Sequence, residues 1–193
     1  MSAKFLIAGL GNIGNEYHNT RHNIGFDIAD AFVQKHEGIF KSDRLADMAG
    51  IKYKGRQVIV IKPTTYMNLS GRAVLYWMMK EKIEKENILV LVDEIALPLS
   101  KLRLRPSGSD AGHNGLKNIN ELLGTDKYPR LRFGIGNNFP KGMQVDYVLG
   151  KWTGEELPIV KNKVEKCVEL IESFIFIGLQ HTMNQYNKLE FPV

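Results

Sequence analysis

The chain has 193 residues, of which 44% are hydrophobic and 24% charged, the composition of an ordinary globular protein. This composition excludes a fibrous or largely disordered chain, and the length allows one domain, residues 1–193, to bury a core without disulfides or a structural metal. The formal net charge of +5 at pH 7 favours polyanionic partners but identifies none.

The first half of the chain predicts a β, α, β, β, α order. An apolar run over Lys4–Ala8 that ends in glycines is typical of a buried strand, and apolar residues at helical spacing predict a helix from about Asn23 to His36. Asp47–Tyr53 and Gln57–Lys62 predict a hairpin. A second helix is predicted from about Ser70 to Lys82.

The second half continues to alternate strands and helices. Ile88–Val92 is apolar at every position, as in a central strand, and Lys101–Arg105 alternates as in a half-buried strand. A helix over Leu116–Leu123 precedes a strand over Leu131–Ile135, and the tail from Glu155 onward predicts a long amphipathic helix. We therefore expect an α/β fold, specifically a three-layer α/β/α sandwich around a mixed, mostly parallel sheet.

The sequence has one cysteine and no long apolar segment. Cys167 cannot form an internal disulfide, and its apolar neighbours predict a buried, unreactive thiol. The N-terminal apolar run is too short for a signal peptide, and no segment approaches the length of a membrane span. We expect a cytoplasmic protein without a membrane partner.

The segment GLGNIG fits the GxGxxG pattern of dinucleotide-binding loops, with glycines at 9, 11 and 14. Such a site needs the third glycine at the start of a helix, but the nine residues Asn15–Asn23 separate Gly14 from the helical pattern. We interpret the segment as a tight turn that passes close to a substrate. A nucleotide-dependent oxidoreductase remains an alternative that cofactor binding would reveal.

Polar side chains follow several predicted strands. In an open α/β sheet, the loops beyond the carboxyl ends of the strands converge on one crevice. One imidazole, one carboxylate and several amides there suit hydrolysis by water, with the imidazole as base, the carboxylate orienting it and amides stabilising an oxyanion. Each residue alone is more typical of a helix cap or a solvated loop than of a catalytic site. The residues concerned are Asn12, His22, Asn23, Asn68, Asp93, His113 and Asn114.

Other chemistries find less support in the sequence. No HExxH or other close spacing of metal ligands occurs, so we expect no metal, and the absence of GxSxG argues against a serine hydrolase. A group of basic residues suits either phosphate binding or an ordinary solvated surface. Its members are Lys101, Arg103, Arg105, Lys117, Lys127, Arg130 and Arg132.

Five blocks, in order, resemble the bacterial-type peptidyl-tRNA hydrolases: GLGNIGNEYHNTRHNIGF, KPTTYMNLSG, VDEIALP, AGHNGLKNI and LRFGIG. The resemblance runs from about Lys4 through the helical tail. It implies a monomeric α/β enzyme, without metal or cofactor, that hydrolyses the ester between a peptide and the 3′ end of tRNA and so recycles tRNA from aborted translation.

The resemblance also implies roles for matching residues. His22 would be the catalytic base and Asp93 the acid that supports it. Amides that place the peptide, the water and the carbonyl would be Asn12, Asn68 and Asn114. Other residues lining the cleft would be Tyr17, Met67 and His113. The pair that grips the 5′ phosphate of tRNA would be Arg105 and Arg132.

Two positions depart from the family pattern. Ile13 replaces a proline after Asn12, and we expect the turn and Asn12 to keep their places. Asp110 lies where the family has a run of glycines, which adds a negative charge beside the expected RNA surface. A non-catalytic RNA-binding protein on the same scaffold would have lost His22 or Asp93, and both are present.

Overall fold

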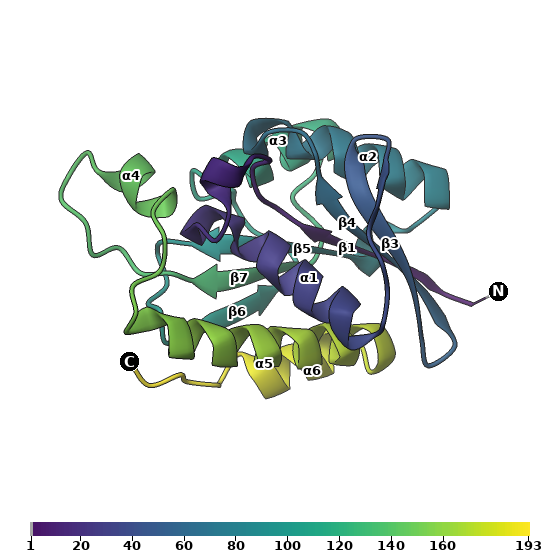
Figure 1. The fold of residues 1–193 in the computed structure, drawn as a ribbon. Coiled ribbons are helices and arrows are strands. Elements are labelled where there is room, and N and C mark those ends of the chain that lie inside the picture. Colours follow the sequence, from purple (N-terminus) through teal and green to yellow (C-terminus); the bar gives the residue numbers. More distant parts are fainter. Residues whose placement is uncertain (1) are drawn as a thin grey trace.

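The computed structural model describes residues 2–193, which build one seven-stranded sheet covered by helices on both faces (Figure 1). The strands are β1 (Lys4–Gly9), β2 (Lys41–Asp43), β3 (Ala46–Tyr53), β4 (Arg56–Pro63), β5 (Ile88–Glu94), β6 (Leu102–Arg105) and β7 (Arg130–Gly134). Their order across the sheet is β2-β3-β4-β1-β5-β7-β6. Only β3 and β6 run against the other strands, so the expected mixed, mostly parallel sheet is confirmed.

The helices form the two outer layers of the predicted sandwich. On one face lie α1 (Ile24–Lys35), α5 (Glu156–Phe176) and α6 (Leu179–Tyr186). On the other lie α2 (Ser70–Glu81) and α3 (Asn114–Leu123). None of the helices within residues 2–193 is both long and apolar enough to cross a membrane.

Strand β1 shows how the sheet serves two cores at once. Phe5 and Ile7 belong to the core beneath α1 and α5, whereas Leu6 and Ala8 belong to the core beneath α2 and α3. Successive side chains of a strand point to opposite faces, so a strand covered on both faces must be apolar at every position. This is why the central strands appear in the sequence as unbroken apolar runs.

The sequence pattern misses three short elements. All three residues of β2 are exposed, and the short helix α4 (Gln144–Val148) has no buried side chain, so neither shows an apolar period. Helix α6 is separate from α5 because Gly178, with φ of 107°, turns the chain between them. The predicted hairpin is present as β3 and β4, and Gly124 ends α3 in the left-handed conformation.

The central strands β4, β1, β5 and β7 run parallel, so the loops after them meet at one edge of the sheet. The loop after β1 carries the 3₁₀ turn Arg21–Asn23, and the loop after β4 carries the 3₁₀ turn Met67–Leu69. Residues 137–150, which follow β7 and contain α4, are called the α4 arm below. Figure 1 shows this arm projecting beyond the end of the sheet.

Close backbone packing explains the glycines at the start of the chain. A Cβ on Gly9 would lie 2.2 Å from the carbonyl oxygen of Gly25, and one on Gly25 would lie 2.5 Å from backbone atoms of Leu10 and Leu91. The start of α1 therefore rests directly on β1 and β5. Gly9 allows the close packing of this helix on the sheet. Only the three-residue 3₁₀ turn Asn15–Tyr17 follows Gly14, and α1 begins at Ile24, so the loop lacks the helix N-terminus that a dinucleotide site requires.

The buried Lys163 links α5 to the loop before β6 and to the end of β7. Lys163 Nζ donates to the carbonyl oxygens of Leu99, at 2.6 Å, and Gly134, at 2.8 Å, and lies 3.8 Å from the centre of the Phe133 ring. Burial lowers its pKa to about 7. One turn along, Cys167 is buried as predicted, and burial raises the pKa of its thiol to about 12, which makes it a poor nucleophile.

Candidate active site

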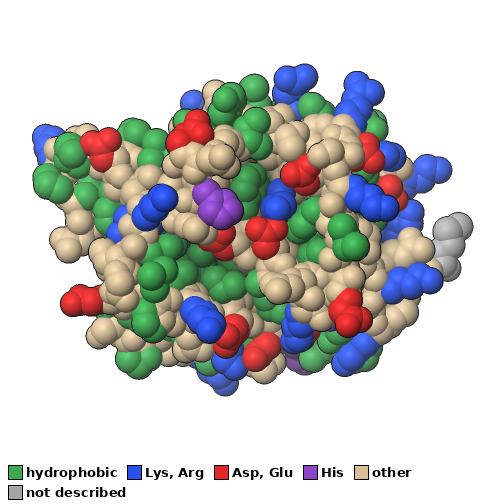
Figure 2. Space-filling view, in the orientation of Figure 1, with side chains coloured by type: hydrophobic (Ala, Val, Ile, Leu, Met, Phe, Trp, Pro, Cys, Tyr) green, Lys and Arg blue, Asp and Glu red, His purple; other side chains and the backbone are tan. Residues whose placement is uncertain are grey.

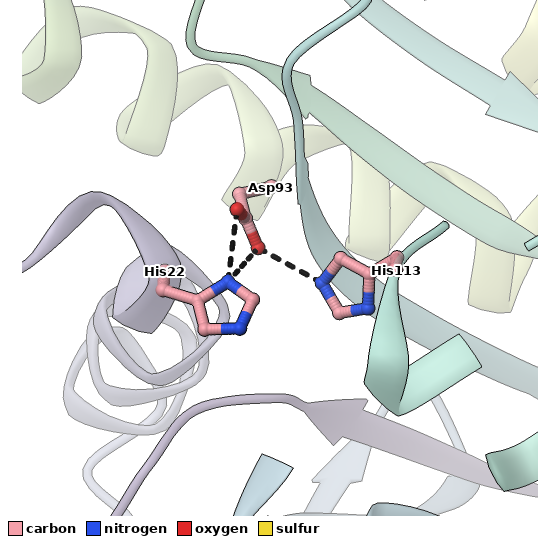
Figure 3. A group of neighbouring side chains, drawn as sticks. All are labelled: His22, Asp93 and His113. Atoms are coloured by element: carbon pink, nitrogen blue, oxygen red, sulfur yellow. Dashed lines mark hydrogen bonds and ion pairs between the residues drawn. The ribbon is translucent and has the colours of Figure 1, made fainter. Parts of the chain in front are cut away.

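Three side chains that lie far apart in the sequence meet at the carboxyl edge of the sheet (Figure 3). His22 lies in the 3₁₀ turn Arg21–Asn23, which α1 holds against β5. Asp93 is near the end of β5, where its carboxylate is almost fully buried. His113 is the N-cap residue of α3. The predicted convergence of His22 and Asp93 is therefore present in the fold, with a second histidine beside them.

Asp93 accepts hydrogen bonds from both imidazoles. His22 Nδ1 lies 2.9 Å from Oδ1 and 3.0 Å from Oδ2 of Asp93, and His113 Nε2 lies 3.0 Å from Oδ1. Burial by itself would raise the pKa of the carboxyl group, but the two histidines outweigh burial and hold the pKa of Asp93 well below its usual range. Asp93 is therefore ionised at neutral pH.

The charge of Asp93 acts in turn on His22. Burial lowers the pKa of His22, but the negative charge of Asp93 and its hydrogen bond raise the pKa more, so the net pKa lies above its usual value. Figure 3 shows the second ring nitrogen, Nε2, turned away from Asp93. His22 therefore has one nitrogen that is fixed by the carboxylate and one that is free to accept a proton.

Hydrogen bonding also assigns the protonation of His113. Its Nδ1 accepts from the backbone N–H groups of Gly115, at 3.2 Å, and Leu116, at 3.3 Å, at the start of α3. Nδ1 thus carries no proton, and the proton sits on Nε2, which donates to Asp93.

The same protonation bears on metal binding. Donor atoms of His22, Asp93 and His113 lie within 4.8 Å of one another, a spacing that a metal ion could use. A metal on Nε2 of His113 would place the ring proton on Nδ1, where it would face two N–H donors. These atoms therefore suit a hydrogen-bonded network better than a metal centre.

Asn12 fastens two loops together. Its Oδ1 accepts from the backbone N–H of Met67 at 2.8 Å, which ties the loop after β1 to the loop after β4. Asn23 holds the backbone of Asn12 in a reciprocal pair, at 2.8 Å and 2.9 Å. This clasp keeps Asn12 in place, as expected, although Ile13 stands where the family has proline.

The other predicted cleft residues differ in their positions. Asn114, the first residue of α3, lines a pocket together with His22, Asp93, His113 and, from α4, Val145 and Val148. Asn68 is exposed in the 3₁₀ turn that packs against α3. Met67 is buried there and packs against the start of α3, since a Cβ on Gly115 would lie 2.7 Å from its Sδ. Tyr17 lies in the 3₁₀ turn Asn15–Tyr17 and does not line this pocket.

A second hollow next to the pocket contains the predicted arginine pair. Arg105 is exposed on β6, whereas Arg132 on β7 is buried. Arg132 donates to Glu94 Oε2 and to the carbonyl oxygen of Ser109, both at 2.7 Å. Glu94 lines both hollows, so they adjoin each other. Within residues 2–193, Arg105 has no carboxylate partner and its Nη1 donates only to the carbonyl oxygen of Leu104, at 3.3 Å, whereas Arg132 is bound by Glu94.

Asp110 has a structural use in this chain. Its Oδ1 accepts from the backbone N–H of Gly112 at 2.8 Å, and its carbonyl oxygen accepts from the N–H of His113 at 2.9 Å. This turn delivers the chain to the start of α3. The carboxylate is thus engaged in shaping the loop before His113, in place of the glycines that are usual in the family.

Three further residues hold the site. The sequence places Asn23 only among the polar residues of the crevice and assigns no role to Glu94 or Arg21. Asn23 clasps Asn12, Glu94 binds Arg132, and Arg21 lies buried beside α4. Each directly precedes or follows a predicted catalytic residue in the sequence. That adjacency is the signal that could have pointed to them.

The parallel strands of this α/β sandwich place a histidine–aspartate pair in a pocket at their carboxyl ends. This arrangement is typical of an α/β enzyme. A model of the peptidyl-tRNA hydrolase family matches residues 6–192, and the chain belongs to this family.

Several known members are similar over their whole length. The peptidyl-tRNA hydrolase of Phocaeicola vulgatus is 56% identical over 96% of this chain and 99% of its own length. That of Bacteroides fragilis is 54% identical with the same coverage. The crystal structure of peptidyl-tRNA hydrolase from Acinetobacter baumannii superimposes with a TM-score of 0.93 at 31% identity, over 100% of this chain and 98% of that one.

Proposed function

We propose that this protein hydrolyses the ester bond between peptide and tRNA in peptidyl-tRNA, using a water molecule activated by His22. Family membership supports the reaction and the tRNA substrate. The observation that carries the mechanism is the His22–Asp93 pair, which leaves Nε2 of His22 unbound by the carboxylate at the edge of a pocket.

In the proposed reaction, Nε2 of His22 takes a proton as the oxygen of water attacks the ester carbonyl carbon. The bond between that carbon and the 3′ oxygen of the terminal ribose then breaks. The proton on His22 passes to the departing oxygen, so that free tRNA and a peptide carboxylic acid leave. Asp93 stabilises the imidazolium that forms in between, and His113 keeps the carboxylate oriented.

The amides have different tasks in this proposal. Asn68 and Asn114 present exposed side chains on either side of the contact between α3 and the turn Met67–Leu69, where an amide N–H can stabilise an oxyanion or hold the peptide. Asn12 contributes by joining the two loops, since its Oδ1 is already bonded to Met67. The proposal includes a monomer that acts without metal or cofactor, as the resemblance to the family implies.

The substrate class can be tested with two matched tRNAs. We expect the protein to release N-acetyl-aminoacyl groups from tRNA rapidly and to leave the same aminoacyl-tRNA with a free amine intact. Acid-precipitable label, followed over time, measures both reactions. Binding of the blocked tRNA without release would instead identify a non-catalytic RNA-binding protein. A rise in melting temperature with NAD or a flavin would favour the oxidoreductase alternative.

The arginine hollow gives a second test, because its two arginines differ in environment. Figure 2 shows Lys and Arg side chains interspersed with acidic ones on the face drawn. Arg105→Ala should lower the slope of log K against log salt by about one unit, as expected for one lost phosphate contact. Titration of tRNA at several salt concentrations measures this slope. Lys52→Ala, an exposed strand residue in the other half of the sheet, is the matched control.

For Arg132→Ala the main effect should be on stability. Glu94 would remain buried without its partner, and loss of one member of a buried pair costs about 3 to 5 kcal/mol of unfolding free energy. Denaturant unfolding would reveal this loss.

For the salt titration of the other arginine, equal slopes for wild type and Arg105→Ala would show that Arg105 is only a surface charge.

A further inference from the structure

Arg21, the residue before His22, has a buried guanidinium group that the proposed reaction does not use. Its side chain is only 8% exposed. Nη2 donates to Glu156 Oε2 of α5 at 2.8 Å, and Nη1 donates to the carbonyl oxygen of Tyr147 in α4 at 3.3 Å. A buried cation with such partners is costly to assemble, so its position points to a specific task.

The guanidinium also lies against two aromatic rings. Its carbon is 4.3 Å from the centre of the Tyr147 ring and 5.3 Å from that of Trp152. Arginine suits this setting because its flat group can stack on rings while its edge donates hydrogen bonds, which lysine cannot do. Arg21 thereby touches the end of the α4 arm, the segment after it and the start of α5.

Backbone contacts repeat the same connection. The N–H of Arg21 donates to the carbonyl oxygen of Gly150 at 3.0 Å, and Thr20 forms an isolated antiparallel bridge with Lys151. A Cβ on Gly150 would lie 3.0 Å from Nη1 of Arg21, so a side chain there would press on the guanidinium. The turn that carries His22 and the end of the α4 arm are thus bound along both backbone and side chain.

The α4 arm has little else to hold it in place. None of the residues of α4 is buried, and Val145 is 65% exposed. The other supports of Tyr147 are a hydrogen bond from its hydroxyl to the carbonyl oxygen of Ile135, a contact with the Phe139 ring and, together with Val148, partial packing against the edge of the core. Yet Gln144, Val145 and Val148 form one wall of the pocket that contains His22. The position of this wall depends on a helix without a core of its own.

We propose that Arg21 is a positioning residue that fixes the α4 wall of the pocket relative to His22. This proposal rests on the proposed function for its kinetic consequence, but not for its structural one. Arg21 does not contact the reacting atoms. When it is lost, the α4 arm moves away from the pocket and the substrate ester is held less well, while the His22–Asp93 pair stays intact.

The test uses Arg21→Met, which keeps an apolar stem and removes the charge, and Tyr147→Leu, which keeps the carbonyl oxygen bound by Nη1 but removes the ring against the guanidinium and the hydroxyl bond to Ile135. In both, we expect amides of residues 137–150 to exchange hydrogen at least about 10-fold faster than in the wild type, while amides of β5 keep their protection. The KM for N-acetyl-aminoacyl-tRNA should rise about 10-fold with a smaller change in kcat. The acid limb of the pH profile, where kcat/KM falls as the pH decreases, should stay at the same pH as in the wild type.

Lys166→Met, which removes an exposed ion pair with Glu169 on α5, is the matched control and should change none of these quantities. Arg21→Lys should rescue only a small part of the effect, because it keeps the charge and loses the stacking. Unchanged exchange in the α4 arm of Tyr147→Leu would overturn the proposal even if Arg21→Met does not fold. A shifted acid limb without faster exchange would also overturn it, since Arg21 would then act on His22 directly. The exchange measurement needs no substrate, so it stands apart from any failure of the proposed reaction.

Discussion

His22→Ala is expected to lower the single-turnover rate of peptidyl-tRNA hydrolysis by about 10²- to 10⁴-fold, the usual contribution of a positioned general base. The affinity for tRNA should not change, because the arginine hollow is formed by other residues. Rapid-quench measurements with N-acetyl-aminoacyl-tRNA give the rate, and titration with uncharged tRNA gives the affinity. The residual rate should come from the amides and from placement of the ester.

His36→Ala is the matched control for this variant. His36 also pairs with a carboxylate, Glu172, at 3.0 Å, but at the opposite end of α1. The His36→Ala variant should retain the wild-type rate of peptidyl-tRNA hydrolysis. Half the wild-type rate in His22→Ala would remove His22 from the role of base, whatever happens in the control.

The second large effect is expected from Asp93→Asn, which keeps the shape of the side chain and removes its charge. The rate should fall by about 10²-fold or more, since the imidazolium that forms during the reaction loses its counter-charge. His22 should also lose the interaction that raises its pKa, while the burial that lowers it remains. The pKa of His22 should therefore decrease.

The sign of the pH effect follows from the role of the base. In the wild type, kcat/KM should fall as the pH drops through the raised pKa of His22, because the protonated imidazole cannot accept a proton from water. In Asp93→Asn this acid limb should move to lower pH. Asp30→Asn, which alters a partly exposed pair with Lys62, is the control and should leave the limb in place. An unmoved limb in Asp93→Asn would show that the limb reports a group other than His22.

The two departures from the family pattern are compatible with the same site. Ile13 lacks the fixed φ of proline, but Asn23 binds the backbone of Asn12 from both sides and supplies the restraint. Asp110 replaces backbone freedom with a side-chain hydrogen bond to Gly112. In both cases hydrogen bonds within this chain hold the local backbone in place.

Most of the secondary structure could be predicted, because burial imposes a period on long elements. Strand β5 is apolar throughout since it is covered on both faces, and α5 shows its buried stripe. Elements without a buried face, such as β2 and α4, leave no such period. They form because neighbouring parts of the chain hold them.

The candidate site also has features that a local sequence pattern predicts and features that it does not. By itself, the sequence determined the residue types and the motifs that indicate the family. It also placed His22, Asn68 and Asp93 at one edge of the sheet, because the loops that carry them follow parallel strands. Only the tertiary structure decided which groups are free. Arg132 is bound by Glu94, His113 has its proton fixed by the start of α3, and Arg21 is held between α4 and α5. The partners of His113 are its neighbours in α3, but Glu94 and Glu156, the partners of Arg132 and Arg21, are distant in the sequence. Pairings between distant residues follow from how the layers pack rather than from any local pattern.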